Sequence, residues 1–309
     1  MTSDSLKNIE NLVINTFKNA LINGDITFEG FKTVEQLIDG CSYQIRYVPN
    51  IRKKPEKDDV AKIDKDSLAP PYGHNLQVCD IPNYGLNQTT YVILLNKFPA
   101  TKNHFLLLPH DFTKQSNILS ADDLSLIYEI LQNYRRTKIF AFHNCGEDSG
   151  ASQKHKHIQF FPVTENEPPI DVYLQEENNY DRANQLIQVP WAHFVISLHP
   201  PEQSDQLGNY LIDRFIQLLD KMFSLKEGKE FDRAKASYNV LITKKYMHLI
   251  PRSKDIFVLP NGSHKSVGST DYAGILIIKQ ETDIKELENV GVTNVLLAVG
   301  RKKDENNEE

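Results

Sequence analysis

The 309-residue sequence is poor in cysteine and contains no apolar run long enough to cross a membrane. A membrane-spanning helix needs about 20 consecutive apolar residues. The three cysteines, Cys41, Cys79 and Cys145, are odd in number, and none lies at metal-ligand spacing from another. A disulfide framework is therefore disfavoured, and we expect reduced thiols in a reducing compartment.

The sequence also lacks a surplus of basic residues, since 35 Lys and Arg stand against 41 Asp and Glu, a net charge of −6. Nucleic-acid binders usually carry a basic surplus, so we expect no nucleic-acid partner. The first residues, MTSDSLKNIE, have neither the basic nor the apolar region of a secretory signal. We therefore expect a cytoplasmic monomer, with the nucleus as an alternative location, that acts on small molecules without a membrane partner.

The apolar periodicity predicts an α+β fold. Helical spacing occurs at 5–23 and 205–223, and again after Ser120, where Asp123 stands at the capping-box offset. Short apolar or alternating runs predict strands at 43–47, 91–95, 105–108, 139–143, 155–161, 194–198, 239–243, 247–250 and 274–278. Strands in groups with helices between them favour an antiparallel sheet with flanking helices.

The domain organisation follows from the same pattern. We expect one catalytic domain over residues 1–300. The polar, proline-containing stretch at about 50–75 is expected to be a mobile surface loop, and it could act as a lid. The charged residues 301–309, RKKDENNEE, predict a disordered tail.

The most informative segment runs from His143 to Phe161 and has the sequence HNCGEDSGASQKHKHIQFF. On a strand, alternate side chains share one face, so two imidazoles and an amide, from His155, His157 and Gln159, would line one surface. The preceding loop holds two glycines and two serines, which suit a close approach of backbone N–H groups to an anion. A neutral imidazole beside such a loop can attack phosphorus, so the segment predicts phosphoryl-group transfer.

Simpler explanations compete with each feature. A single H-x-H pair arises often by chance, and a glycine-serine loop alone is more often a plain surface turn. The two histidines could also be half of a metal site, with His193, His199 or His248 approaching in space, although no third ligand stands at a typical spacing. The combination of loop and strand is much more specific than either feature.

At this point the sequence resembles a known family. H-K-H-I-Q is similar to the H-x-H-x-Q motif of the transferase branch of the histidine-triad superfamily. Four further segments resemble the fungal diadenosine tetraphosphate phosphorylases, also called ATP adenylyltransferases: LLNKFP (94–99), NCGxxSGASQ (144–153), YNVLITKK (238–245) and LIPR (249–252). The resemblance extends from about Tyr43 to Lys279, and it implies a histidine-triad-like antiparallel sheet and reversible phosphorolysis of diadenosine tetraphosphate to ATP and ADP.

The resemblance also implies roles for individual residues. His157 would be the nucleophile that becomes adenylylated, with His155 in support, and Gln159 would bind the phosphate that undergoes transfer. The implied substrate contacts are Lys54, Asn96, Lys97, Asn144, Ser149, Gly150, Ala151, Ser152, Gly268, Ser269, Thr270, Ile275 and Lys279. In the loosely aligned 50–75 stretch, Lys53 could replace Lys54. Gly268 stands where the family pattern has a polar side chain, and Ile275 where it has Met.

Gln159 bears on the choice between transfer and hydrolysis. Hydrolase branches of the superfamily have a third histidine there, which can exchange protons near neutral pH, whereas an amide cannot. Water must lose a proton to attack, but inorganic phosphate is already anionic, so Gln159 favours phosphate. The alternatives are a sugar-1-phosphate uridylyltransferase, a dinucleoside polyphosphate hydrolase and a nucleotide sensor without turnover. We expect Mg²⁺ to arrive with the polyphosphate, because the sequence has no carboxylate cluster for a site of its own.

Overall fold

The computed structural model describes residues 2–49, 51, 66–73, 75–163, 168–174, 180–225 and 235–304. Lys53, Lys54, most of the stretch predicted as a mobile loop, and residues 305–309 of the predicted tail lie outside these ranges. Within the tail, Lys302 forms a β-bridge with Trp191.

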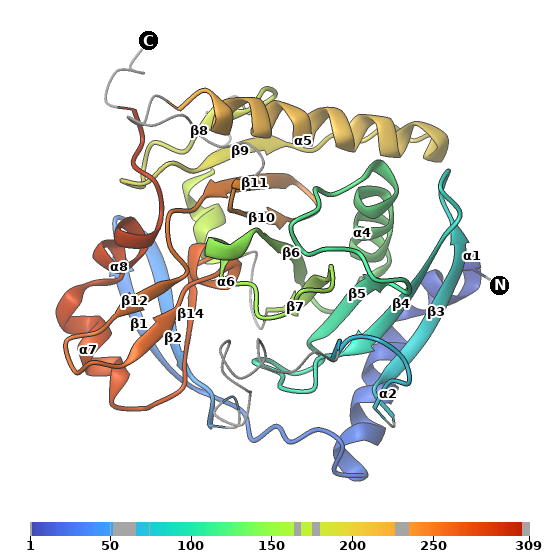
Figure 1. Ribbon diagram of the computed structural model, residues 1–309, viewed down its shortest axis with the longest axis horizontal. Helices are drawn as coiled ribbons and strands as arrows, with labels where there is room; N and C mark the ends of the chain where they lie inside the picture. The colour runs from blue at the N-terminus through green and yellow to red at the C-terminus, as the bar shows by residue number, and fades with distance from the viewer. Residues whose placement is uncertain are drawn as a thin grey trace.

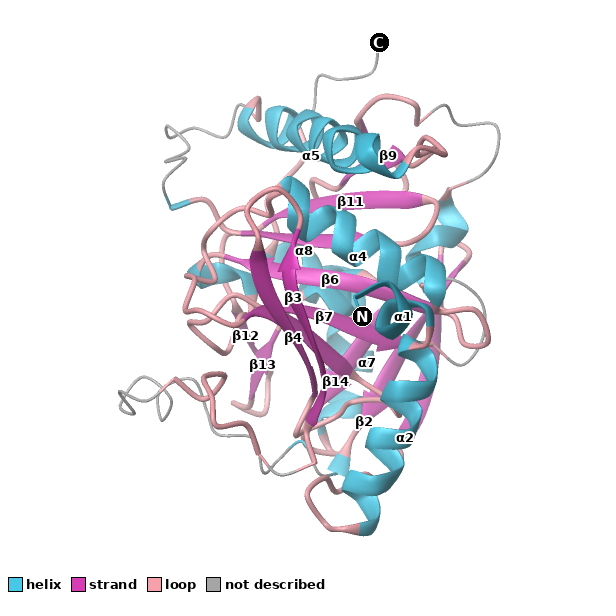
Figure 2. Ribbon diagram, turned by 90° about the vertical axis from the view of Figure 1, so that its right-hand side faces the viewer, coloured by secondary structure: helices cyan, strands magenta, loops and turns pink. Residues whose placement is uncertain are grey.

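A nine-stranded antiparallel sheet forms the centre of the molecule (Figure 1). Its spatial order is β3, β4, β5, β7, β6, β10, β11, β9 and β8. In chain order these strands are Gln77–Tyr84 (β3), Thr89–Leu95 (β4), Phe105–Pro109 (β5), Ile139–Cys145 (β6), Ile158–Pro162 (β7), Asn184–Gln185 (β8), Phe194–Ser197 (β9), Tyr238–Ile242 (β10) and Tyr246–Pro251 (β11). The sheet is strongly twisted: in Figure 2, β6, β7 and β11 run across the view, whereas β3 and β4 run steeply.

Helices cover one face of this sheet. They are Thr2–Lys7 (α1), Ile9–Ile22 (α2), Ala121–Asn133 (α4) and Leu207–Phe223 (α5). The predicted helix at 5–23 is thus divided at Asn8, whose backbone departs from helical geometry. The predicted capping box of α4 is confirmed, because the Ser120 hydroxyl accepts from the Asp123 amide and the Asp123 carboxylate accepts from the Ser120 amide. Apolar side chains of α2, α4 and α5 pack with alternate residues of the strands in the larger core cluster.

The opposite face carries a second layer. It contains a three-stranded sheet of Lys32–Ile38 (β1), Cys41–Tyr47 (β2) and Ile275–Ile278 (β14), a hairpin of Ile256–Val258 (β12) and His264–Ser266 (β13), and the helices Ser269–Tyr272 (α6), Asp283–Val290 (α7) and Val292–Val299 (α8). A second core cluster joins this layer to β6, β7, β9, β10 and β11. A third, smaller cluster lies on β4 and β5, where Leu68 and Tyr72 pack against it.

The predicted α+β class with a large antiparallel sheet and flanking helices is confirmed. The predicted strand at 155–161 is wrong at its start, because β7 begins only at Ile158. The backbone groups of the three preceding residues make other hydrogen bonds. The Lys156 amide donates to the Thr113 carbonyl at 2.7 Å, and the His155 carbonyl faces the His157 ring. His155 and His157 therefore precede the regular strand, whereas Gln159 lies on it.

Candidate active site

The ring of His157 is held from its own backbone neighbourhood. Its Nδ1 lies 2.8 Å from the carbonyl oxygen of His155, and the residue is 4% exposed. A carbonyl oxygen can only accept, so Nδ1 must carry a hydrogen. In the neutral ring the lone pair is then on Nε2, which makes that atom the nucleophilic one.

The ring of His155 is itself anchored at both nitrogens. Nδ1 lies 2.8 Å from a carboxylate oxygen of Asp66, and Nε2 lies 2.9 Å from the carbonyl oxygen of Pro109. The side chain of His155 is fully buried. This anchoring fixes the residue whose carbonyl orients His157.

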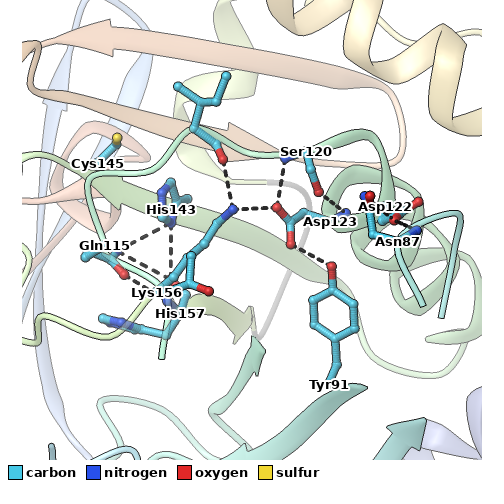
Figure 3. Close-up of polar contacts among 12 residues, drawn as sticks. Asn87, Tyr91, Gln115, Ser120, Asp122, Asp123, His143, Cys145, Lys156 and His157 are labelled. Carbon is cyan, nitrogen blue, oxygen red and sulfur yellow. Dashed lines mark hydrogen bonds and ion pairs between the residues drawn. The ribbon is translucent and has the colours of Figure 1, made fainter. Parts of the chain in front are cut away.

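Gln115 joins the two halves of the predicted site (Figure 3). Its side-chain oxygen accepts from the His157 amide at 2.8 Å, and its nitrogen donates to the Asn144 carbonyl at 2.7 Å. Gln115 is buried, so both bonds are shielded from water. One side chain therefore sets the spacing between the backbone of the predicted nucleophile and that of a predicted nucleotide contact.

A buried ion pair lies behind this arrangement (Figure 3). Lys156 Nζ is 2.5 Å from Asp123 Oδ2 and also donates to the Ile118 carbonyl at 2.8 Å. Burial alone would raise the pKa of Asp123, but Lys156, the Ser120 amide and the Tyr91 hydroxyl together lower it below its usual value. The pair links the start of α4 to the segment that carries His157.

His143 occupies the same layer and is neutral. Burial, and to a lesser degree the positive charge of Lys156, lowers its pKa to about 3. Its Nδ1 lies 3.2 Å from the His157 carbonyl oxygen, so this ring supports the backbone of His157 on the side of the helix layer.

The loop after β6 depends on two glycines with positive φ. Gly146 has φ +87° and Gly150 has φ +80°, with a short 3-10 turn, Glu147–Ser149, between them. A Cβ on Gly150 would overlap the carbonyl oxygen of Val267. The sequence therefore needs glycine there both for the backbone conformation and for the close approach of the 267–269 segment.

A buried polar network fixes this loop against the rest of the fold. The Asn144 side-chain oxygen accepts from Asn239 Nδ2 at 2.8 Å and from the hydroxyl and amide of Ser269 at 2.6 and 3.1 Å. Asn239 Nδ2 also donates to the Ser149 carbonyl, and its oxygen accepts from Arg252 at 2.6 Å. Arg252 in turn donates to the carbonyls of Ser149 and Val267. Three segments that are distant in sequence thus meet at one place.

Gln159 is half-buried and lies on β7 opposite Leu106 of β5 and Phe142 of β6. Its side-chain oxygen is 3.0 Å from Nε2 of His104. The Nδ2 atom of Asn96 approaches the same imidazole, 3.4 Å from Nδ1. The predicted contacts Asn96 and Gln159 are therefore connected through a histidine that the sequence did not single out.

The remaining predicted substrate contacts differ in their location and in how exposed they are. Gly268 begins α6 beside Asn144, and its amide donates to Asp271 at 2.8 Å. Lys97 is exposed near the Phe98 ring, Ala151, Ser152 and Lys279 are half-buried, and Thr270 is buried on α6. Ile275 is fully buried on β14 within the second core cluster. The structure thus brings together Asn144, Ser149, Gly150, Gly268 and Ser269.

Among the described residues, no group of three His, Cys, Asp or Glu side chains is arranged to hold a metal ion. His193 and His248, considered above as metal ligands, are buried together and joined through ring nitrogens 3.0 Å apart. Within the same ranges, none of the helices has the length and apolar character needed to cross a membrane. All three cysteines are free thiols.

Sequence reasoning missed the residues that hold the site in place. Gln115 and His104 stand outside every motif, so their roles had no signal in the sequence. Asn239 and Arg252 stand inside the segments YNVLITKK and LIPR, but the pattern gave no reason to separate them from their neighbours. They are buried beneath the loop rather than exposed to a ligand.

Known proteins resemble this chain along most of its length. In Saccharomyces cerevisiae, diadenosine 5',5'''-P1,P4-tetraphosphate phosphorylase 2 is 29% identical over 305 residues, covering 92% of this chain and 90% of that protein. The crystal structure of yeast Ap4A phosphorylase Apa2 superposes with a TM-score of 0.78 at 26% identity and covers 96% of this chain and 98% of that one. The structure of Apa2 in complex with Ap4A gives a TM-score of 0.76 at 25% identity, with coverage of 96% and 98%.

Two family models account for nearly all of the sequence. The Ap4A phosphorylase N-terminal domain matches residues 4–176, and the ATP adenylyltransferase C-terminal domain matches residues 187–302. Together with the buried His157, the glycine loop and the Asn144 network, these matches show that the chain belongs to the Ap4A phosphorylase (ATP adenylyltransferase) family.

Proposed function

We propose that this chain cleaves diadenosine tetraphosphate with inorganic phosphate to give ATP and ADP, through an adenylyl group carried on His157. The observation that carries the proposal is the 2.8 Å contact between His157 Nδ1 and the His155 carbonyl. It assigns the proton to Nδ1 and the nucleophilic lone pair to Nε2, in a segment adjoining a loop suited to phosphate.

The first step forms a bond between Nε2 and an α-phosphorus of the dinucleotide. The bond from that phosphorus to the bridging oxygen breaks, and ATP leaves with the electron pair. The adenylylated ring keeps its Nδ1 hydrogen and becomes cationic, and the His155 carbonyl stabilises it as an acceptor. A fixed carbonyl dipole thus acts where positive charge develops.

In the second step an oxygen of inorganic phosphate attacks the same phosphorus. The P–N bond breaks, ADP forms, and the neutral ring of His157 is restored. No proton needs to be removed from the attacking phosphate, which agrees with an amide at position 159 rather than a general base. This is our reason to favour phosphorolysis over hydrolysis.

The substrate complex would include Mg²⁺ bound to the polyphosphate, which neutralises charge during transfer. The residues proposed to hold nucleotide and phosphates are Asn144, Ser149, Gly150, Ala151, Ser152, Gly268, Ser269 and Thr270. Lys54, Lys97 and Lys279 would add positive charge, and Ile275 is proposed to contact the base. A monomer in the cytoplasm acting on free nucleotides completes the proposal.

Product analysis tests this function directly. The protein is incubated with diadenosine tetraphosphate and Mg²⁺, with and without inorganic phosphate, and the nucleotides are separated. ATP and ADP formed only in the presence of phosphate support the proposal. AMP and ATP formed without phosphate would make the chain a hydrolase, and no turnover would favour the uridylyltransferase or a sensor.

A matched variant locates the intermediate. We expect the wild type, incubated with diadenosine tetraphosphate without phosphate, to gain the mass of one adenylyl group in an acid-labile form. His157→Gln is expected to abolish both this gain and turnover. Gln159→His should raise the rate of AMP release without phosphate, because it restores a group able to take a proton from water.

A further inference from the structure

Gln159 lies where the two smaller core clusters approach each other. Its partner across β5 is Leu106, which belongs to the cluster on β4 and β5, and its partner across β6 is Phe142, which belongs to the cluster under β2 and β14. Directly opposed residues in an antiparallel sheet project to the same face. The amide of Gln159 therefore projects from the face opposite the helices, between two apolar walls.

An amide in this position can work in only one orientation. Its oxygen would repel a phosphate, whereas its NH₂ group would donate hydrogen bonds to it. Rotation by half a turn about the last side-chain bond exchanges the two and costs little unless a neighbour distinguishes them. The orientation of Gln159 must therefore be imposed by its surroundings.

A backbone N–H fixes the orientation of the Asn96 side-chain amide. The Phe98 amide, which can only donate, lies 2.9 Å from the side-chain oxygen of Asn96. This bond fixes the Asn96 amide, so its NH₂ group points toward His104, with the nitrogen 3.4 Å from Nδ1. The backbone adds rigidity, because the Asn96 amide donates to the His104 carbonyl at 2.9 Å.

The tautomer of His104 follows from these contacts. The Asn96 nitrogen is almost equally far from the two ring nitrogens, 3.4 Å from Nδ1 and 3.5 Å from Nε2, so its NH₂ group faces the ring and is not aligned with one lone pair. The Gln159 oxygen lies 3.0 Å from Nε2, and because an amide oxygen can only accept, the ring hydrogen belongs on Nε2. His104 is 4% exposed, and its ring packs edge-on against Phe161, 5.3 Å between centroids. The ring is thus not free to turn over.

We propose that His104 is a positioning residue that holds Gln159 by its oxygen and so directs the NH₂ group of Gln159 to the phosphate undergoing transfer. Asn96, which is oriented by the Phe98 amide, places its NH₂ group against the His104 ring, and Nε2–H of His104 donates to the Gln159 oxygen. The role at the phosphate rests on the proposed function, whereas the direction of the hydrogen bonds does not.

The first test measures the tautomer of His104 by ¹⁵N NMR of histidine-labelled, full-length protein without ligand. The His104 signals are identified by their loss in His104→Phe. The proposal predicts hydrogen on Nε2 of His104, while His157 in the same spectrum should carry it on Nδ1. Hydrogen on Nδ1 of His104 would overturn the proposal, whatever reaction the protein performs.

The second test asks whether His104 acts through Gln159. His104→Phe keeps the ring contact with Phe161 and should lower kcat about 10- to 100-fold with little change in KM, as for a misplaced catalytic group. Gln159→Leu should cost about 100-fold or more. In the Gln159→Leu background, His104→Phe should cause no further loss, because its target is absent.

Two outcomes of this cycle would contradict the proposal: equal losses from His104→Phe in both backgrounds, or a rise in KM alone. His199→Phe, at an exposed histidine, serves as the matched control and should leave kcat unchanged. If wild-type protein forms no ATP and ADP, the proposed function fails, and the NMR result still decides the direction of the hydrogen bonds.

Discussion

The carbonyl oxygen of His155 accepts the Nδ1 hydrogen of His157 across 2.8 Å, so one histidine sets the chemistry of the other through its backbone. The side chain of His155 has a separate task, because Asp66 and Pro109 hold it from both sides. The H-x-H pattern therefore places an oriented acceptor next to the His157 ring. It does not place two catalytic imidazoles side by side.

Substitution of Asp66 tests whether the ring of His155 must be anchored. Asp66→Leu removes the acceptor at Nδ1 and should lower kcat about tenfold, since the carbonyl that orients His157 gains freedom. Asp66→Asn keeps an oxygen acceptor and should retain most of the activity. Steady-state kinetics of both variants would decide, and full activity of Asp66→Leu would contradict the idea.

Gln115→Leu should weaken both stability and turnover. It leaves the His157 amide and the Asn144 carbonyl without their buried partner, at a cost of about 1–3 kcal/mol for each unsatisfied group. Urea unfolding measures the loss in the free energy of unfolding, and kcat should fall about 100-fold as the two segments shift. A variant that loses stability but keeps kcat would separate Gln115 from the positioning of His157.

Two glycines with similar backbone angles allow a matched comparison. Gly150 and Gly262 have φ of +80° and +82°, but only at Gly150 would a Cβ meet other atoms. Gly262→Ala should cost about 1–2 kcal/mol, from backbone strain alone. Gly150→Ala should cost more and raise KM for the dinucleotide, because the loop must move away from Val267. Equal stability and equal KM would refute the steric argument.

The pair of Lys156 and Asp123 predicts an asymmetry between single and double substitution. Lys156→Met leaves a buried carboxylate without its cation and should destabilise the protein by about 3–5 kcal/mol. Adding Asp123→Asn removes the charge, while the amide oxygen can still accept from Ser120, so part of the loss should return. Thermal or urea unfolding of the wild type, the two single variants and the double variant gives the coupling energy, and additive losses would be the contrary result.

The pKa of His143 predicts a contribution to stability with a definite sign. Its folded-state pKa is about 3, below an unfolded-state value of about 6.5, so between these values the unfolded chain binds more protons. This contribution is fully present above pH 6.5 and is lost as the pH falls toward 3, by up to about 1.4 kcal/mol per pH unit. Burial likewise lowers the pKa of His193, which acts in the same direction.

The contribution of His143 can be isolated by urea unfolding of His143→Gln and wild type between pH 4.5 and 7. The free energy of unfolding should rise less steeply with pH in the variant than in the wild type. The difference in slope should correspond to about one fewer proton taken up on unfolding. Identical slopes in the two proteins would mean that His143 is not buried in its neutral form.

Local sequence patterns predicted the elements whose signal is short in range. The capping box at Ser120 and Asp123 and the strands at 91–95 and 105–108, which pair as β4 and β5, all involve residues close along the chain. The break at Asn8 and the late start of β7 were not predictable in this way. At β7, the departure arises from bonds between His155, Lys156 and Thr113 that form only in the folded state.

The candidate site was predicted to the extent that it is contiguous. His157, Gln159 and the glycine loop lie within one segment, and the structure packs that segment against Gly268 and Ser269, which the resemblance implied as substrate contacts. Gln115, His104 and Arg252 act by joining segments, so their importance depends on tertiary contacts that no local pattern encodes. The burial of Ile275, which the resemblance implied as a base contact, likewise depends on tertiary packing.

The network around Asn144 has a consequence for the order in which the site is assembled during synthesis. Asn144 and Asn239 are separated by 95 residues, and Ser149 and Arg252 by 103, so the native contacts of this site have long sequence separations. At about 5–20 residues per second, the ribosome adds Arg252 roughly 5–20 seconds after His157. A nascent chain thus carries His157 before the contacts around Asn144 can form. The glycine loop therefore gains its full set of buried hydrogen bonds only after β10 and β11 have joined the sheet.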